Sequence, residues 1–195
     1  MKKVILTLSL VAITQLVKAQ YKAPEEQAEV LPQFYLALST GIDNYTGILG
    51  VGTQIPLDER FSIRAGVGLG AWGTKLSAGI KYENLAQKGV GFGLSYSHCT
   101  GIKDIDLELQ DQNGDVRTIN FDLLTVGSIN ATINKNWVFK NKNIFYLEGG
   151  YAFATGGGTF YKVNDGTVLN SNDQLILRIM RPGGLILSVG FLIGL

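Results

Sequence analysis

The chain has little of several features that would point to other protein classes. Its one cysteine, Cys99, cannot form an intramolecular disulfide, so no disulfide framework is expected. Charged residues make up only 17% of the chain and form no basic patch or stripe, which argues against a nucleic-acid partner. After the first 20 residues, no apolar run approaches the roughly 18 residues that a transmembrane helix needs. If the chain enters a membrane, it must do so as a closed β-barrel, because only helices and barrels satisfy every backbone polar group in lipid.

The first 19 residues are predicted to be a secretory signal peptide. A positively charged start precedes a short, mostly apolar stretch over 4–17, and small or branched residues stand before a cleavage site at Gln20. We expect residues 20–32, which are polar and contain two prolines, to form a flexible periplasmic tail. Loss of three lysines with the signal peptide leaves 14 basic and 16 acidic side chains, a net charge of about −2.

From Gln33 onward the sequence alternates with a period of two, which is the signature of β-strands. In 60–72 one face is apolar throughout, whereas the other carries arginine, serine and glycine with almost no bulk. A soluble sandwich would not usually fill its second face with glycine. A narrow barrel, by contrast, needs small and polar residues inside and apolar residues facing lipid.

The same division recurs in eight segments, an even number, as in bacterial single-chain barrels. They cover residues 34–38, 45–57, 60–72, 75–83, 89–97, 128–134, 145–153 and 185–195. Short connections at 57–60, 84–88 and 139–143 are expected at the periplasmic end. We therefore predict an all-β fold, a transmembrane antiparallel up-and-down barrel of eight strands spanning 33–195.

Aromatic residues near the strand ends predict two girdles at the lipid interfaces. Those expected at the periplasmic side are Phe34, Phe61, Tyr82 and Phe145, and those expected at the other side are Tyr45, Tyr96 and Phe153.

Two outer connections are long and are predicted to be hairpins that protrude above the bilayer. The connection from Thr100 to Thr118 contains an Asn-Gly turn signal at Asn113, and the one from Gly156 to Leu175 contains Asp165-Gly166. Pro182-Gly183-Gly184 predicts a kink at the start of the last strand.

The C-terminal stretch Ser188-Val189-Gly190-Phe191-Leu192-Ile193-Gly194-Leu195 resembles the assembly signal of outer-membrane barrels, although it ends in leucine rather than an aromatic residue. Together with the signal peptide and the eight segments, it makes the chain resemble the small OmpX/OmpA-type barrel superfamily of Gram-negative outer membranes. The resemblance implies outer-membrane lipids and the barrel-assembly machinery as partners. It implies no single function, because this barrel carries adhesins, structural proteins, lipid-modifying enzymes and narrow pores.

Several charged residues are expected to face the lumen, where they must pair to avoid an uncompensated buried charge. The predicted polar network consists of Arg60, Arg64, Lys81, Glu83, Asp122 and Glu148, with Lys75 in the same phase. A salt-bridged plug is favoured over a narrow conduit, because side chains can just fill an eight-stranded barrel.

Asp104, Asp106 and Glu108 are predicted to share an acidic face on the first outer hairpin. A solvated surface is favoured over a calcium site, since charge runs usually serve solvation. The residues from Gly68 to Gly73 match the spacing of the dinucleotide-binding motif. That motif needs a strand, a glycine turn and then a helix, whereas these glycines lie within a predicted strand, so nucleotide binding is not expected.

His98-Cys99-Thr100 is similar in position to the outer-wall dyad of lipid A 3-O-deacylases. Threonine replaces the serine nucleophile there, and no acidic orienting residue is evident. We therefore expect a non-catalytic barrel with a structural or surface-interaction role, without cofactor or metal, and with a surface protein as the candidate ligand. The alternatives are a narrow porin-like channel and a lipid A-modifying enzyme.

Overall fold

A computed structural model of the chain describes residues 31–156 and 158–195. The predicted signal peptide, residues 1–19, and residues 20–30 of the predicted tail lie outside this range. The strands are β1 (Tyr35–Ile42), β2 (Leu49–Pro56), β3 (Phe61–Gly70), β4 (Gly73–Tyr82), β5 (Gly89–Cys99), β6 (Ile102–Gln110), β7 (Val116–Leu123), β8 (Val126–Val138), β9 (Ile144–Thr155), β10 (Tyr161–Val163) and β11 (Gly184–Gly194), and the helix is α2 (Ser171–Met180). No helix within the described residues is long and apolar enough to cross a membrane.

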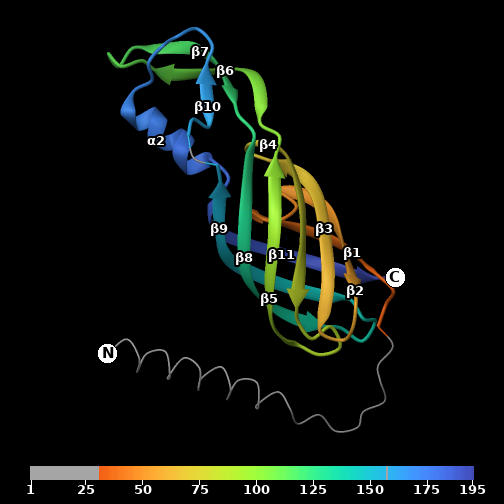
Figure 1. The fold of residues 1–195 in the computed structure, drawn as a ribbon. Coiled ribbons are helices and arrows are strands. Elements are labelled where there is room, and N and C mark those ends of the chain that lie inside the picture. The colour runs from red at the N-terminus through yellow and green to blue at the C-terminus, as the bar shows by residue number, and fades with distance from the viewer. Residues whose placement is uncertain (1–30, 157) are drawn as a thin grey trace, which may run out of the picture. The chain divides into compact units, whose positions relative to one another are not determined.

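Eight of the described strands close into an antiparallel barrel in the order β1-β11-β9-β8-β5-β4-β3-β2 (Figure 1). β1 and β11 complete the closure through a ladder that runs from Tyr35↔Gly194 to Ile42↔Leu187. The predicted all-β fold with eight barrel strands is confirmed, and each predicted segment contributes one strand.

The alternation within each strand separates the two faces of the barrel wall. In β5 the serines and glycines point inward, whereas Phe92, Leu94 and Tyr96 are exposed on the outer face. The interior holds serine, asparagine, glutamine and charged side chains, many of them fully buried. This arrangement inverts that of a soluble protein, in which buried positions are mostly apolar.

One end of the barrel is closed by short turns, as predicted. The Asp58 carboxylate accepts hydrogen bonds from the backbone N–H groups of Arg60 and Phe61. Asn84 caps the next turn in the same way, accepting from Ala86 and Gln87.

The first long connection at the other end is a hairpin, as predicted. β6 pairs with β7 from Ile105↔Phe121 to Gln110↔Val116, with a register shift between Ile102 and Ile105. Gly114 supplies the positive φ angle of 87° at the tip, which the Asn-Gly signal anticipated.

The second long connection is not a hairpin, so that prediction was wrong. Its short strand β10 pairs with β7 of the first hairpin, giving a small sheet of order β10-β7-β6. The Asp-Gly turn is followed by helix α2, whose N-cap Asn170 accepts a hydrogen bond from the backbone N–H of Asn172 at 2.9 Å. In place of a hairpin whose two arms pair with each other, one part of this connection pairs with the edge of β7 and another part forms a helix capped by Asn170.

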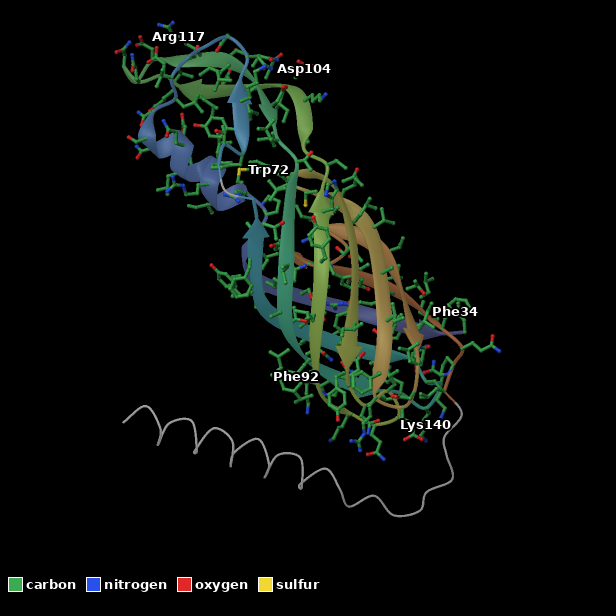
Figure 2. All side chains as sticks on the ribbon, viewed as in Figure 1. Phe34, Trp72, Phe92, Asp104, Arg117 and Lys140 are labelled. Carbon is green, nitrogen blue, oxygen red and sulfur yellow. The ribbon has the colours of Figure 1, made fainter. Side chains whose placement is uncertain are left out.

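The small sheet and α2 form a folded unit that we call the cap (Figure 1). Its core contains Ile119, Phe121 and Leu123 from β7 together with Leu169 and Leu177. This core continues onto the barrel rim through Trp72, whose indole Nε1–H donates to the Leu124 carbonyl at 2.8 Å (Figure 2). The cap is therefore held to the barrel by shared packing and a hydrogen bond.

Candidate functional site

The lumen contains a network of buried charges contributed by strands on opposite sides of the barrel. Arg64 on β3 donates from Nη1 to both carboxylate oxygens of Glu148 on β9, at 2.9 and 2.7 Å. Lys81 on β4 pairs with Glu83 at 2.9 Å and lies 3.8 Å from Glu148. Four of the six predicted network residues, Arg64, Lys81, Glu83 and Glu148, are thus brought together, and their ion pairs link the walls across the lumen.

Neutral side chains satisfy the remaining capacity of Glu83. Asn134 and Asn136 each donate to its Oε2 at 2.7 Å, and Gln54 donates to Oε1. A buried carboxylate is tolerated when its lone pairs are occupied in this way. These amides come from β2 and β8, and only the register of the closed barrel brings them to one carboxylate.

Two predicted network residues lie elsewhere. Arg60 belongs to the turn before β3, is exposed, and donates to the Tyr82 hydroxyl at 3.3 Å. Asp122 lies on β7 in the cap, because β8 of the barrel begins only at Val126. Their inward assignment was therefore wrong, since period-two alternation fixes the face of a strand but not where the barrel wall ends.

The connection between β1 and β2 enters the lumen, which the sequence analysis missed. Tyr45 is buried, and the Arg64 guanidinium lies 4.7 Å from its ring centroid, so the prediction of Tyr45 in a lipid-facing girdle was wrong. Asn44 Nδ2 donates to Ser39 Oγ and Thr46 Oγ1, each at 2.9 Å. Glycine makes room for this segment: a Cβ on Gly68 would lie 1.8 Å from the Thr46 carbonyl oxygen.

The predicted acidic face of the cap is shorter than expected. Asp106 and Glu108 share one face of β6, opposite Asn120 and Thr118. Asp104 lies in the irregularity before the ladder resumes, with a positive φ of 54°, so the alternation does not extend to it.

Asp104 and Asp122 instead form a local contact in the cap. The Asp104 backbone N–H donates to Asp122 Oδ1 at 2.9 Å, and Asn164 Nδ2 donates to the same oxygen at 3.1 Å. These hydrogen bonds stabilise the charged carboxylate and hold the pKa of Asp122 below its usual value of 3.8. The bond from the Asp104 backbone has the larger effect. In the described part of the chain, no group of three or more histidine, cysteine or acidic side chains could hold a metal ion.

His98 lies near the rim on β5, between Leu76 of β4 and Gly127 of β8. Over the described ranges, no hydrogen bond or ion pair reaches its side chain, and the neighbouring Thr100 hydroxyl donates to the Gly101 carbonyl at 3.2 Å. A nucleophile needs a base and an orienting group in mutual reach. This geometry does not supply them.

A cavity of about 540 Å³ lies at the rim of the barrel beneath the C-terminal end of α2. Apolar side chains dominate its walls, among them Ile42, Ile48, Trp72, Ile179 and Met180. Lys75, which the sequence placed in the lumen, is buried at this cavity and pairs with Asp43, donating to its carboxylate and, at 3.0 Å, to its backbone carbonyl. We call this space the mouth cavity.

Sequence reasoning missed the mouth cavity because its walls come from parts of the chain far apart. One signal was nevertheless present: Asn170 before an amphipathic run and Pro182 just after it are the marks of a short helix. Neither a scan against protein-family models nor a search of the curated proteins gives a match to this chain.

Proposed function

We propose that the protein is an integral outer-membrane β-barrel with a non-catalytic, surface-interaction role carried by its cap. The observation that supports this is the inverted barrel, apolar on the outside and polar within. Monomeric soluble proteins rarely expose contiguous apolar patches larger than a few hundred Å², whereas every barrel strand here exposes large apolar side chains on its outer face.

Aromatic pairs near both ends of the barrel support the proposed membrane placement. Two of them lie at the end with short turns. Phe61 packs against Tyr82 at 5.0 Å between ring centroids, and Trp137 packs against Phe145 at 5.6 Å. Tyr151 and Phe153 pair toward the cap end at 5.0 Å. Belts of aromatic residues are favoured where the hydrocarbon core meets the headgroups.

The lumen argues against the channel alternative. The Arg64–Glu148 pair, the Glu83 cluster and the inserted residues 44–46 occupy the interior, and the four charged side chains of the network are almost fully buried. An eight-stranded barrel is just wide enough for side chains to fill. A filled, salt-bridged lumen serves barrel stability better than conduction.

The cap favours a binding role because it has a packed core, shared with the barrel rim, and a strand edge that is open over much of its length. β6 is an edge strand of the small sheet. Its last residue, Gln110, is covered by hydrogen bonds to Asn170 and Asp173, but Ile102 and Leu107 are exposed. An exposed edge is a template for adding a strand from another chain. The acidic side chains Asp106 and Glu108 on β6 favour a partner with basic residues.

Fractionation of cells that express the full chain tests the placement. The mature protein should be recovered in the outer membrane and should migrate differently on gels before and after heating, as a folded barrel does. Recovery as a soluble periplasmic protein would overturn the proposal.

A further inference from the structure

The mouth cavity adjoins the outer surface of the barrel across a thin wall. A second cavity of about 650 Å³ lies on the outer wall of the barrel against β9 and β11. Both cavities are bounded by Ile42, Ile179, Arg181, Pro182 and Gly183. These residues therefore form the boundary between the barrel mouth and its outer, apolar surface.

The barrel wall is short at this boundary. β1 ends at Ile42, which pairs with Leu187, so residues 184–186 of β11 are paired with β9 but not with β1. A hydrogen bond from the Gly183 backbone N–H to Asp43 Oδ2, at 2.9 Å, spans this notch. The notch lies between the end of β1 and the bend at Pro182-Gly183, which leads from α2 into β11.

Cationic side chains stand at the notch. Arg181 borders both cavities, and Arg178 of α2 borders the outer one. Across residues 31–156 and 158–195, neither arginine pairs with a carboxylate. Arg181 donates from Nη2 to the Gly156 carbonyl at 3.1 Å, and its guanidinium lies 5.2 Å from the ring centroid of Phe160, while its buried Nε has no hydrogen-bond partner. A guanidinium with free donors is well suited to a carboxylate.

The apolar side chains beside the notch complete an amphipathic arrangement. Ile179 and Met180 of α2 are exposed and border the mouth cavity, and Trp72 forms part of its inner wall. In size the cavity lies within the range of roughly 300–1,000 Å³ that holds small molecules, and toward its lower half. It therefore favours one acyl chain over a lipid with several.

We propose that the mouth cavity binds a long-chain fatty acid, which reaches it sideways from the outer leaflet through the notch. The carboxylate binds Arg181, and the acyl chain lies against Trp72, Ile48 and Met180. This inference rests on the proposed membrane placement of the barrel, because a sideways route needs lipid at the outer wall.

Tryptophan fluorescence tests the proposal, since the chain has two tryptophans and Trp72 borders the cavity. A Trp137→Phe background leaves Trp72 as the reporter. The protein is placed in phosphatidylcholine nanodiscs and titrated with a dibrominated C18 fatty acid, whose bromines quench tryptophan at short range. Saturable quenching of Trp72 is expected. Quenching that rises without saturation, equal to that from dibrominated phosphatidylcholine, would overturn the proposal.

Arg181→Gln should weaken the affinity about tenfold or more, the usual loss for a hydrogen bond to a charged group. Arg181→Lys should retain most of the affinity, and Arg60→Gln, at the far end of the barrel, should leave it unchanged. The methyl ester of the dibrominated fatty acid, titrated into protein that keeps Arg181, should bind as weakly as the free acid binds to the Arg181→Gln variant. Equal affinity for acid and ester would overturn the role of Arg181 even if the glutamine variant does not fold.

Access from the side has its own test. Ile42→Phe narrows the notch and should slow the onset of quenching severalfold, whereas Ile55→Phe, on the outer face of β2, should not. Equal rates would overturn the sideways route. Heat-modifiable migration of each variant is measured in parallel, so that failure of the barrel to enter a membrane is distinguished from failure of a membrane-inserted barrel to bind the fatty acid.

Discussion

Arg64 and Glu148 are 84 positions apart in the sequence, yet one guanidinium nitrogen donates to both carboxylate oxygens inside the barrel. Both side chains are almost fully buried. Because water cannot replace either partner, the pair is expected to govern barrel stability.

Arg64→Ala should lower the free energy of unfolding by about 3–5 kcal/mol, since it leaves a buried carboxylate without its main partner. Urea titration in detergent, followed by gel migration, measures this. Arg60→Ala is the matched control, because Arg60 is exposed in a turn, and it should change stability by no more than about 0.5 kcal/mol. An Arg64→Ala protein as stable as the control would refute the paired-lumen description.

The double variant Arg64→Met with Glu148→Leu should be more stable than Arg64→Ala. Removing both charges abolishes the desolvation penalty, and apolar replacements of buried ion pairs are often neutral. Lys81 would lose only its longer contact, at 3.8 Å, and keep Glu83 at 2.9 Å. The same urea titration applies, and a double variant less stable than Arg64→Ala contradicts the prediction.

Gly68→Ala should displace residues 44–46 from the lumen, because the added Cβ would lie 1.8 Å from the Thr46 carbonyl oxygen. Overpacking of this kind costs about 1–3 kcal/mol. Gly70→Ala, two residues along the same face, meets its nearest atom at 3.5 Å and is the control. Urea titration of the two variants measures the loss of stability, and equal stability of both would refute the prediction. Single-channel conductance would show whether displacement of residues 44–46 opens the lumen.

Leu177→Ala should loosen α2 without unfolding the barrel. Leu177 is the buried residue of the helix and packs in the cap core, and such truncations cost about 2–5 kcal/mol. Amide exchange should accelerate over 171–180 while β8 and β9 stay protected. Leu175→Ala, exposed on the same helix, should have little effect. Simultaneous loss of protection in β8 would mean that cap and barrel unfold as one unit.

Acid should weaken the contact between Asp122 and Asp104. The Asp122 carboxyl has a lowered pKa because it accepts the Asp104 backbone N–H and the Asn164 amide. A group with a depressed folded-state pKa contributes stability above its unfolded pKa, and that contribution is lost as pH falls through the folded value. Carboxyl carbon shifts in a pH titration should give a midpoint below 3.8 for Asp122. A midpoint at or above this value would contradict the contact.

The alternation of residues in the sequence was enough to identify the eight barrel strands and the inward face that carries Arg64, Lys81, Glu83 and Glu148. A strand repeats every two residues, so its two faces can be read without knowing its neighbours. The Asn-Gly tip of the first hairpin could also be predicted, because a positive φ angle is a local requirement.

Only the tertiary structure decided which charges meet. Partners such as Arg64 and Glu148 depend on the register of every ladder around a closed barrel, and that information is spread over the whole chain. The same holds for the insertion of Tyr45, for the pairing of β10 with β7 and for the notch beside Ile42. Each of these features depends on where neighbouring strands end, or on the pairing of a strand edge with a segment far away in the sequence. Local periodicity contains no information about either.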